Sequence, residues 1–292
     1  MRDCIIVGGG PAGLTAALYL ARFLRSVTVF DARDGRAGTI PKTHNLGPFP
    51  HGISGLDLLD RMRSHAELYG AILETGTVGA VERQGDLFHV TTDHRVETAR
   101  SIIFASGVFN HRPPLSIQDH DRGLARGLIR YCPVCDAYEI RGKRIAVLGS
   151  GTHAFDEARF IQGYSAAVTL IPCDGTLPIA RNGIGVLGSP MSGLALSDSQ
   201  VIVTLENGET RQFDSAYVAL GTTARTGPAT RLGVRLNEGG CVVVDAKQRT
   251  SMDRVYAIGD VTEGLDQIAF AMGQGAVAAT AIHNDLPSVT FA

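Results

Sequence analysis

The chain contains two glycine-rich turns, and these turns restrict its fold more than any other feature. The first, Gly8-Gly9-Gly10-Pro11-Ala12-Gly13, follows an apolar run at 5–7 and precedes a helical pattern over 14–24. A second apolar run ends at Asp31, 23 residues past Gly8. Gly-x-Gly-x-x-Gly in such a strand–turn–helix–strand unit is typical of Rossmann folds, where small residues admit a pyrophosphate and an acid holds the ribose. The sequence therefore predicts a dinucleotide site at this turn.

A second turn of the same kind lies near the middle of the chain. Gly149-Ser150-Gly151-Thr152-His153-Ala154 follows a strand pattern at 144–148, opens a helix that runs to about 163, and is followed by an apolar run at 168–171. The order again predicts a nucleotide-binding turn, formed by Gly149, Gly151, Thr152 and His153. A His at a helix start is more often a capping or surface residue than a catalytic one, so His153 is interpreted in that way. Further strands are expected at 201–205 and 215–220, with a hairpin turn at Asn207-Gly208.

The late part of the chain indicates that the second unit is inserted into the first. A strand pattern at 255–260 ends in Gly259-Asp260, and a helix rich in small residues follows at about 267–283. We therefore expect an α/β fold of two Rossmann-like domains of the three-layer ββα type. The first would comprise 1–112 and 242–292, and the second 113–241. Pro113-Pro114 and Gly239-Gly240 break local structure, which predicts hinges near 111–114 and 240–242.

Two cysteines separated by two residues lie between the turns. Cys132-Pro133-Val134-Cys135 is followed directly by Asp136. Such a pair can open and close a disulfide with little backbone movement, and its thiols often have lowered pKa values. A structural disulfide across so short a loop would stabilise little, and half of a zinc site would need a second pair of ligands. The remaining cysteines are isolated, so the spacing predicts a redox-active pair and no metal.

Composition excludes several classes of protein. The 292 residues suffice for two domains, and the net charge of -2 with no long basic run argues against a nucleic-acid partner. Five cysteines without framework spacing suggest a reducing compartment. The sequence has no apolar run of transmembrane length and no targeting feature, which leaves the cytoplasm as the expected location.

The motifs, and their order along the chain, resemble those of the low-molecular-weight thioredoxin reductases, a family of flavin disulfide reductases. The resemblance spans nearly the whole chain and rests on five segments: 8–13, Phe104-Ala105-Ser106-Gly107, 132–136, 149–154 and Ile258-Gly259-Asp260. It implies FAD in the first domain, a homodimer, and a thioredoxin-like protein or another thiol or disulfide substrate as partner. It also implies a second domain that rotates to present the disulfide and an electron donor to the flavin in turn.

The resemblance assigns roles to single residues. Cys135 would face the flavin, Cys132 would exchange with the disulfide of the partner, and Asp136 would act as the general acid and base. The dipole of a helix that starts at 267–269 would stabilise reduced flavin. The implied FAD contacts are Gly8, Gly10, Pro11, Ala12, Gly13 and Asp31 at the pyrophosphate and adenosine ribose, Asn45 near the flavin, Ser106 and Gly107, Gly259 and Asp260 at the ribityl chain, and Gln267, Ile268 and Ala269 at that helix start.

One segment departs from the family pattern. Members that use NADPH carry a His-Arg-Arg type cluster after the second strand of the second domain, where Arg matches the 2′-phosphate. This chain has Ile171-Pro172-Cys173-Asp174-Gly175 there, with no Arg before Arg181, and Asp174 would repel a 2′-phosphate. Four alternatives remain: NADH with Asp174 on its ribose, ferredoxin, a second FAD, or a decayed site that binds nothing. Cys-Pro-Val-Cys-Asp with Tyr138-Glu139 is most similar to the diflavin-linked disulfide oxidoreductases, which hold the second FAD.

The expected function is therefore that of an FAD-dependent disulfide oxidoreductase that works without NADPH, with a second FAD as one option. Three alternatives stay open. The chain could be an NAD(P)H- or ferredoxin-dependent thioredoxin reductase, a small-molecule dithiol oxidase, or a flavin-bound redox sensor.

Overall fold

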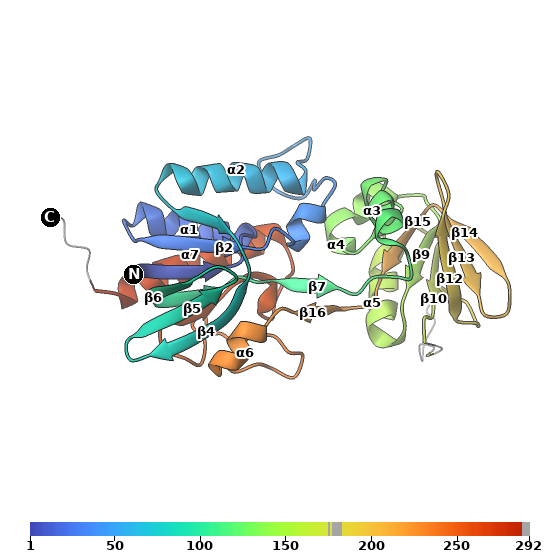
Figure 1. The fold of residues 1–292 in the computed structure, drawn as a ribbon. Helices are drawn as coiled ribbons and strands as arrows, with labels where there is room; N and C mark the ends of the chain where they lie inside the picture. The colour runs from blue at the N-terminus through green and yellow to red at the C-terminus, as the bar shows by residue number, and fades with distance from the viewer. Residues whose placement is uncertain (175, 177–182, 288–292) are drawn as a thin grey trace. The chain divides into compact units, whose positions relative to one another are not determined.

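The computed structural model describes residues 1–174, 176 and 183–287, which divide into two compact units (Figure 1). Unit 1 consists of 1–38, 54–109 and the described residues from 223 onward. Unit 2 consists of 39–53 and the described residues of 110–222. Both units are Rossmann-like and the second interrupts the first, which confirms the predicted fold class.

The boundaries of the units differ from the predicted domain boundaries in two places. The chain returns to unit 1 at Thr223 rather than at 242. The reason is that helix α6 (Gly227–Leu232) packs on strand β4, and Ala229 and Val234 are buried in the core of unit 1. Gly240, where a hinge was predicted, forms a turn inside unit 1 by donating from its N–H to Asn237 O. Residues 39–53, predicted for the first domain, are grouped with unit 2.

Unit 1 is built on a sheet in which β6 joins two layers. The parallel strands have the order β3-β2-β1-β6, and β17 also pairs with β6. The first half of β6 pairs antiparallel with β5, and β5 pairs with β4. The strands are β1 (Arg2–Val7), β2 (Val27–Asp31), β3 (Ile72–Thr75), β4 (Val78–Gln84), β5 (Leu87–Thr92), β6 (Val96–Phe104) and β17 (Val255–Ala257). The helices are α1 (Pro11–Arg22), α2 (Gly55–Leu68), α6, α7 (Ile268–Asp285) and the 3-10 turns η1 (Arg36–Thr39) and η3 (Gly259–Val261).

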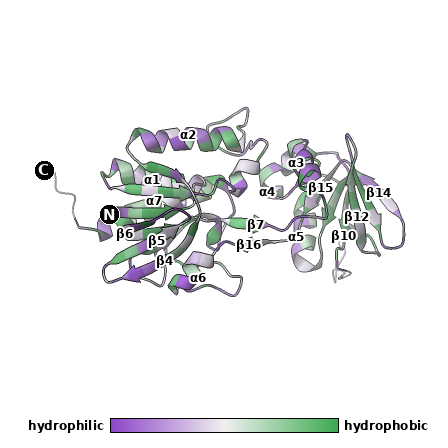
Figure 2. Ribbon diagram, viewed as in Figure 1, coloured by the Kyte–Doolittle hydropathy of each residue, from purple (hydrophilic) through white to green (hydrophobic). Residues whose placement is uncertain are grey.

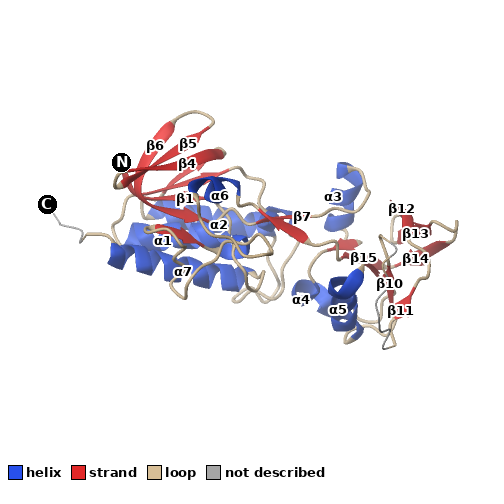
Figure 3. Ribbon diagram, turned by 90° about the horizontal axis from the view of Figure 1, so that it is seen from below, coloured by secondary structure: helices blue, strands red, loops and turns tan. Residues whose placement is uncertain are grey.

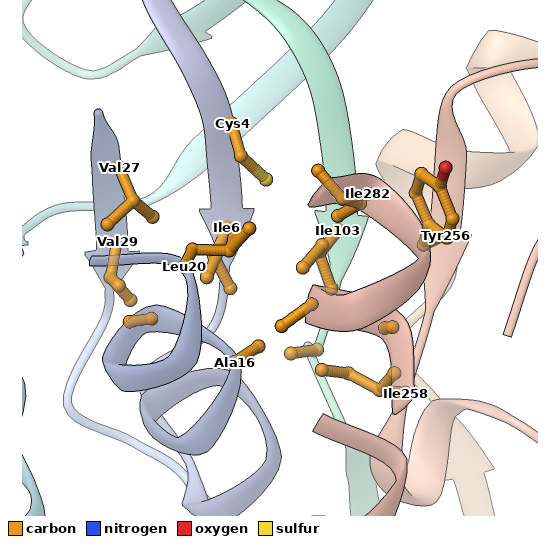
Figure 4. Packing of buried hydrophobic residues seen from close by; sticks show 14 of the residues in the cluster. Cys4, Ile6, Ala16, Leu20, Val27, Val29, Ile103, Tyr256, Ile258 and Ile282 are labelled. Carbon is orange, nitrogen blue, oxygen red and sulfur yellow. The ribbon is translucent and has the colours of Figure 1, made fainter. Parts of the chain in front are cut away.

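Successive side chains of β1 point to opposite faces of the sheet, and each face is covered by a different layer. Cys4 and Ile6 pack with α1 and α7, whereas Ile5 and Val7 pack with the β4–β5 hairpin. Figure 4 shows the helix side of this arrangement, with Cys4 and Ile6 pointing toward the side chains of the two helices. Figure 3 shows the same layering, with the β4–β5 hairpin on one side and α7 on the other. The predicted ββα arrangement is therefore present.

Helices α1 and α7 cross closely because small residues face each other. A Cβ added at Gly275 would lie 2.5 Å from Ala12 O and 3.1 Å from Ala16 N. The α1–α7 crossing fixes the first turn of α1 against the core.

Along α2, by contrast, hydrophilic residues recur from end to end, as expected for a helix with one face in water (Figure 2).

Unit 2 repeats the design on a smaller scale. Its parallel strands have the order β11-β10-β9-β15-β8, and β12-β13-β14 form an antiparallel sheet. The strands are β8 (Ile129–Arg130), β9 (Ile145–Leu148), β10 (Val168–Ile171), β11 (Gly185–Val186), β12 (Met191–Leu196), β13 (Val201–Leu205), β14 (Thr210–Phe213) and β15 (Ser215–Val218), and the helices are α3 (Ile117–Ala125), α4 (Pro133–Asp136), η2 (Ala137–Ile140) and α5 (Gly151–Gln162). Ile145 and Val147 pack with α5, and Ala146 and Leu148 pack with the antiparallel sheet.

Two of the four passages of the chain between the units pair with each other. They are β7 (Val108–Asn110) and β16 (Thr222–Ala224). Arg225 N donates to Gly107 O at 2.9 Å and His111 N donates to Gly221 O at 3.0 Å, which is an antiparallel register. No helix in the described ranges is long and apolar enough to cross a membrane.

Candidate active site

The two cysteines form a disulfide at the start of α4. The Cys132–Cys135 bond has an S–S distance of 2.06 Å and joins Cα atoms 5.2 Å apart. Pro133 begins the helix, and Cys132 Sγ accepts from Cys135 N at 3.1 Å, so the first thiol caps its own turn. Both cysteines are partly exposed, and Val134 between them is 50% exposed. A partner can therefore approach this turn of unit 2.

Asp136 follows the disulfide and is held at both carboxylate oxygens. Tyr217 OH donates to Oδ1 at 2.6 Å, and Arg130 Nη1 lies 2.5 Å from Oδ2. Burial raises the pKa of Asp136, while the Arg130 charge and the Tyr217 hydroxyl act to lower it. Neither partner was predicted. Arg130 could have been suspected from its position two residues before Cys132, but Tyr217 lies on β15 with no local signal.

The two glycine-rich turns have the same construction. A Cβ at Gly8 would meet Ala105 O at 2.3 Å, and a Cβ at Gly149 would meet Ala219 O at 2.4 Å. Ala105 follows β6 and Ala219 follows β15, so each first glycine lies against the end of the neighbouring parallel strand. At the middle glycines, Gly10 and Gly151, a Cβ would meet no heavy atom of the described chain within 4 Å. Both turns therefore leave the open space that a pyrophosphate needs.

The helices that contain the predicted cofactor contacts begin without a side-chain cap. Ser54 caps α2 and Ser116 caps α3 by accepting from Asp57 N and Asp119 N. By contrast, α1, α5 and α7 begin uncapped at Gly10, Ser150 and Gln267, as does the short helix α6 at Thr226. The backbone N–H groups of their first turns are thus available to an anion or a polar ring. These first turns contain the predicted contacts Pro11, Ala12 and Gly13, Thr152 and His153, and Ile268 and Ala269.

The predicted ribose acid, Asp31, lies at the end of β2 beside the first turn. Arg63 Nη2 donates to its Oδ2 at 2.9 Å, and Arg33 N donates to its Oδ1 at 3.1 Å. A small pocket opens here, lined by Gly9, Leu14, Val29, Asp31, Arg33, Arg63, Leu73 and Glu74. An acid in a pocket beside the glycine turn suits the adenosine ribose of a dinucleotide.

Gly259 and Asp260 lie next to the start of α1. A Cβ at Gly259 would be 3.1 Å from Ala12 Cβ, and Gly259 N donates to Gln274 Oε1 at 2.7 Å. Burial and the nearby Asp266 raise the pKa of Asp260 to about 6. Arg36 Nη1 lies 3.3 Å from Asp260 Oδ2 and 2.8 Å from Asp266 Oδ2, a contact that sequence reasoning missed. Asp31 and Gly259 thus both lie beside the glycine turn and the start of α1, while Gln267, Ile268 and Ala269 lie at the start of α7.

Three further predicted contacts make bonds to other segments, although Ser106 N also lies 3.1 Å from where a Cβ of Gly8 would be. Ser106 Oγ donates to Arg225 O at 2.7 Å, and Gly107 O accepts from Arg225 N, so this segment holds β16. Asn45 belongs to unit 2, where its Nδ2 lies 3.4 Å from Val134 O. The structure therefore groups Asn45 with the disulfide turn.

In unit 2, Ser150 ties the second turn to the end of β10. Its Oγ accepts from Cys173 N at 3.0 Å and from Asp174 N at 3.2 Å. Hydrogen bonding with Ser150 and Thr176 lowers the pKa of the exposed Asp174. Asp174 thus stands beside the second turn as Asp31 stands beside the first. His153 is mostly exposed and lies 3.2 Å from Glu157, as expected for a surface residue. Gly175 and Arg181 lie outside the described residues.

Comparisons with known proteins agree with this geometry. Residues 2–275 match the family described as pyridine nucleotide-disulphide oxidoreductase. The chain is 31% identical to the thioredoxin reductase of Treponema pallidum (strain Nichols), over 96% of this chain and 95% of that protein. It is also 31% identical to the thioredoxin reductase of Streptomyces clavuligerus, over 96% and 92%. The crystal structure of thioredoxin reductase from Streptococcus pyogenes MGAS5005 superposes with a TM-score of 0.88 at 28% identity, covering 98% of both chains.

Proposed function

The chain belongs to the pyridine nucleotide-disulphide oxidoreductase family, and on that premise we propose that it exchanges electrons between FAD in unit 1 and a thioredoxin-like protein through Cys132 and Cys135. It is a flavin-dependent disulfide oxidoreductase of the thioredoxin reductase type. The observation that carries the proposal is the partly exposed disulfide directly before a partly buried acid, in a chain with two glycine-rich turns.

The residues of unit 1 fit FAD. Gly10 leaves open space at the uncapped start of α1, Asp31 offers a carboxylate to the adenosine ribose, and Asp260 lies beside the same helix start. When bound, FAD would supply the second two-electron redox couple, with which the Cys132–Cys135 pair exchanges electrons. The backbone N–H groups of α1 would bind its pyrophosphate.

The residues of unit 2 carry the exchange with the partner. In the dithiol form, Asp136 takes the proton of Cys132, and the Cys132 sulfur attacks one sulfur of the substrate disulfide. Cys135 then displaces that substrate sulfur and re-forms the Cys132–Cys135 bond. Asp136 gives the first proton to the other substrate sulfur, which leaves when Cys132 attacks, and the proton of Cys135 then passes through Asp136 to the substrate sulfur that Cys135 displaces. In sum, two protein thiols are oxidised and one substrate disulfide is reduced to two thiols.

For the second turn, we propose a dinucleotide with a free 2′-hydroxyl in place of NADPH. Asp174 would accept a hydrogen bond from that hydroxyl but repel a 2′-phosphate. Support comes from the open space at Gly151, the uncapped start of α5 and the Ser150 contacts that hold Asp174 beside the turn. NADH and a second FAD both contain an adenosine ribose with a free 2′-hydroxyl, so the site fits either of them.

The flavin-to-protein ratio and anaerobic titrations separate these sources. A ratio near two would identify a second FAD, whereas a ratio near one with rapid bleaching by NADH would identify NADH. NADPH is expected to bind roughly tens to hundreds of times more weakly than NADH, because Asp174 would repel its phosphate and the sequence has no Arg between Ile171 and Arg181. Stoichiometric bleaching by micromolar NADPH within seconds would refute the proposal for the second turn.

Matched glycine variants test the same site. Gly151 has φ +69° and Gly85, in the β4–β5 turn, has φ +61°, and both have open space where a Cβ would lie. Gly151→Val should abolish binding at the second turn, while Gly85→Val carries similar backbone strain but should leave it intact. Equal loss of binding in both variants would contradict the assignment.

Turnover assays separate the wider alternatives. Reduction of a thioredoxin-like protein, lost in both Cys132→Ser and Cys135→Ser, would support the proposed function. Peroxide release with small dithiols would point instead to a dithiol oxidase, and absence of turnover with any donor would point to a redox sensor. The homodimer stays a prediction, which sedimentation would test.

A further inference from the structure

Asp136 is held in place by two residues that come from different strands of unit 2. Arg130 ends β8 and Tyr217 lies within β15, and these strands pair in parallel with Tyr217 opposite Arg130. Each therefore reaches one oxygen of the carboxylate, at 2.5 Å and 2.6 Å. The Tyr217 side chain is fully buried, so its hydroxyl has little access to water.

Arg130 is itself fixed at its other end. Its Nε donates to Ser215 Oγ at 3.1 Å and to Gly127 O at 3.2 Å, and Ser215 Oγ donates to Gly127 O at 2.8 Å. The guanidinium thus lies between an anchored hydroxyl and the carboxylate. A planar group held at one edge presents its other edge in one direction, which fixes the position of its charge.

We propose that Arg130 and Tyr217 are positioning residues that keep Asp136 ionised and oriented for proton exchange with the Cys132–Cys135 pair. The inference rests on the acid and base role of Asp136 in the proposed function. Without Arg130, the carboxylate would be partly buried with a neutral hydroxyl as its remaining bonded partner, and its pKa would rise further.

The other groups around Asp136 make this arrangement necessary. Glu139 on η2 acts to raise the pKa of Asp136, in the same direction as burial. Helix α5 also packs against α4. It carries Glu157 and His153, whose side chains lie 3.2 Å apart. Arg130 is the cation whose charge opposes these effects at Asp136.

The test is a pH profile of one exchange step. Full-length protein is reduced with dithiothreitol and desalted under nitrogen, and its reaction with an aromatic disulfide that releases a coloured thiolate is followed in a single turnover. Such a leaving group needs no proton, so the acidic limb of the profile reports the base that activates the thiol. The assay requires no electron donor, so failure of the donor assignment would not affect it.

Arg130→Gln should move the acidic limb upward by about one to two pH units, and Arg130→Lys should restore most of the shift. Tyr217→Phe should move it upward by less. Ser215→Ala, which removes an anchor of Arg130 but no contact to Asp136, is the matched control and should keep the wild-type limb within about half a unit. Asp136→Asn should leave only the rise with pH that ionisation of the Cys132 thiol itself produces, and adding Arg130→Gln to it should change nothing further.

An Arg130→Gln profile that is lower at every pH but unshifted would show a merely structural role and overturn the inference. An acidic limb in Asp136→Asn at the same pH as in the wild type would overturn the acid and base role itself, independently of Arg130.

Discussion

At the scale of single residues, unit 2 contains a second carboxylate, that of Glu157, whose burial disfavours its charged form. Glu157 on α5 has one oxygen, Oε2, that is buried without a hydrogen-bond partner in the described structure, while Oε1 lies 3.2 Å from His153 Nε2. Burial raises its pKa to about 7. A carboxyl whose folded pKa is raised stabilises the fold below its unfolded pKa, and this contribution is lost as pH rises through the folded pKa.

Glu157→Gln should therefore change the pH dependence of stability. Between about pH 4.5 and pH 7 the wild type should lose stability that the variant keeps, so at pH 8 the variant should be more stable by roughly 1–3 kcal/mol. Urea unfolding at pH 5 and pH 8 measures the difference, with the exposed Glu67→Gln as control. A variant less stable than wild type at pH 8 would show that the contact with His153 outweighs the burial of charge.

At the scale of elements, the α1–α7 crossing connects the core to the FAD turn. Gly275 lies against the backbone of α1 at Ala12 and Ala16, so any side chain there must push the first turn of α1 away. Gly273 is in the same helix, yet a Cβ at this position would meet no described heavy atom within 4 Å. Two glycines two residues apart should thus respond in opposite ways to the same substitution.

Gly275→Ala should destabilise the protein by about 1–3 kcal/mol and weaken FAD binding, because the overpacked helix displaces Ala12. Gly273→Ala should be neutral or should stabilise by up to about 1 kcal/mol through helix propensity. Thermal unfolding and flavin release by dilution measure both effects. Similar losses in the two variants would contradict the described crossing.

Sequence reasoning succeeded where the signal is local. The turns at Gly8 and Gly149, the strand over 168–171, the strand over 201–205 and the disulfide spacing are each contained in a few neighbouring residues. It failed where pairing joins distant segments. Tyr217 reaches Asp136 across 81 residues and Arg36 reaches Asp260 across 224, and nothing in either local sequence indicates the partner. The return boundary failed for the same reason, since α6 is bound to unit 1 by its contact with β4.

At the scale of the whole molecule, residues 111–221 of unit 2 begin and end at one paired ribbon, β7 and β16. Because β7 and β16 are antiparallel neighbours, replacing residues 111–221 with an Asn-Gly turn would join two strands that already pair. The shortened chain keeps the sheet of unit 1, both Gly8 and Asp31, and the α1–α7 crossing.

This shortened chain should fold and bind one FAD per chain. Circular dichroism and the flavin-to-protein ratio measure the outcome, and full-length protein measured in parallel shows whether unit 2 adds a second flavin. Failure to bind FAD in a folded, shortened chain would show that unit 2, or the segment at 39–53 that is grouped with it, completes the first site.

The matching construction of the two turns also determines how mutations can accumulate in them. Gly8 and Gly149 lie against backbone carbonyls, so replacement is excluded whether or not a ligand is present. Gly10 lies in open space without a positive φ, and only a bound phosphate penalises a side chain there. In related chains that have lost the ligand, Gly10 should be replaced by other residues first, while Gly8, which lies against a backbone carbonyl, should stay glycine. Aligned descendants of such a chain would then record which cofactor disappeared, even where the fold has not changed.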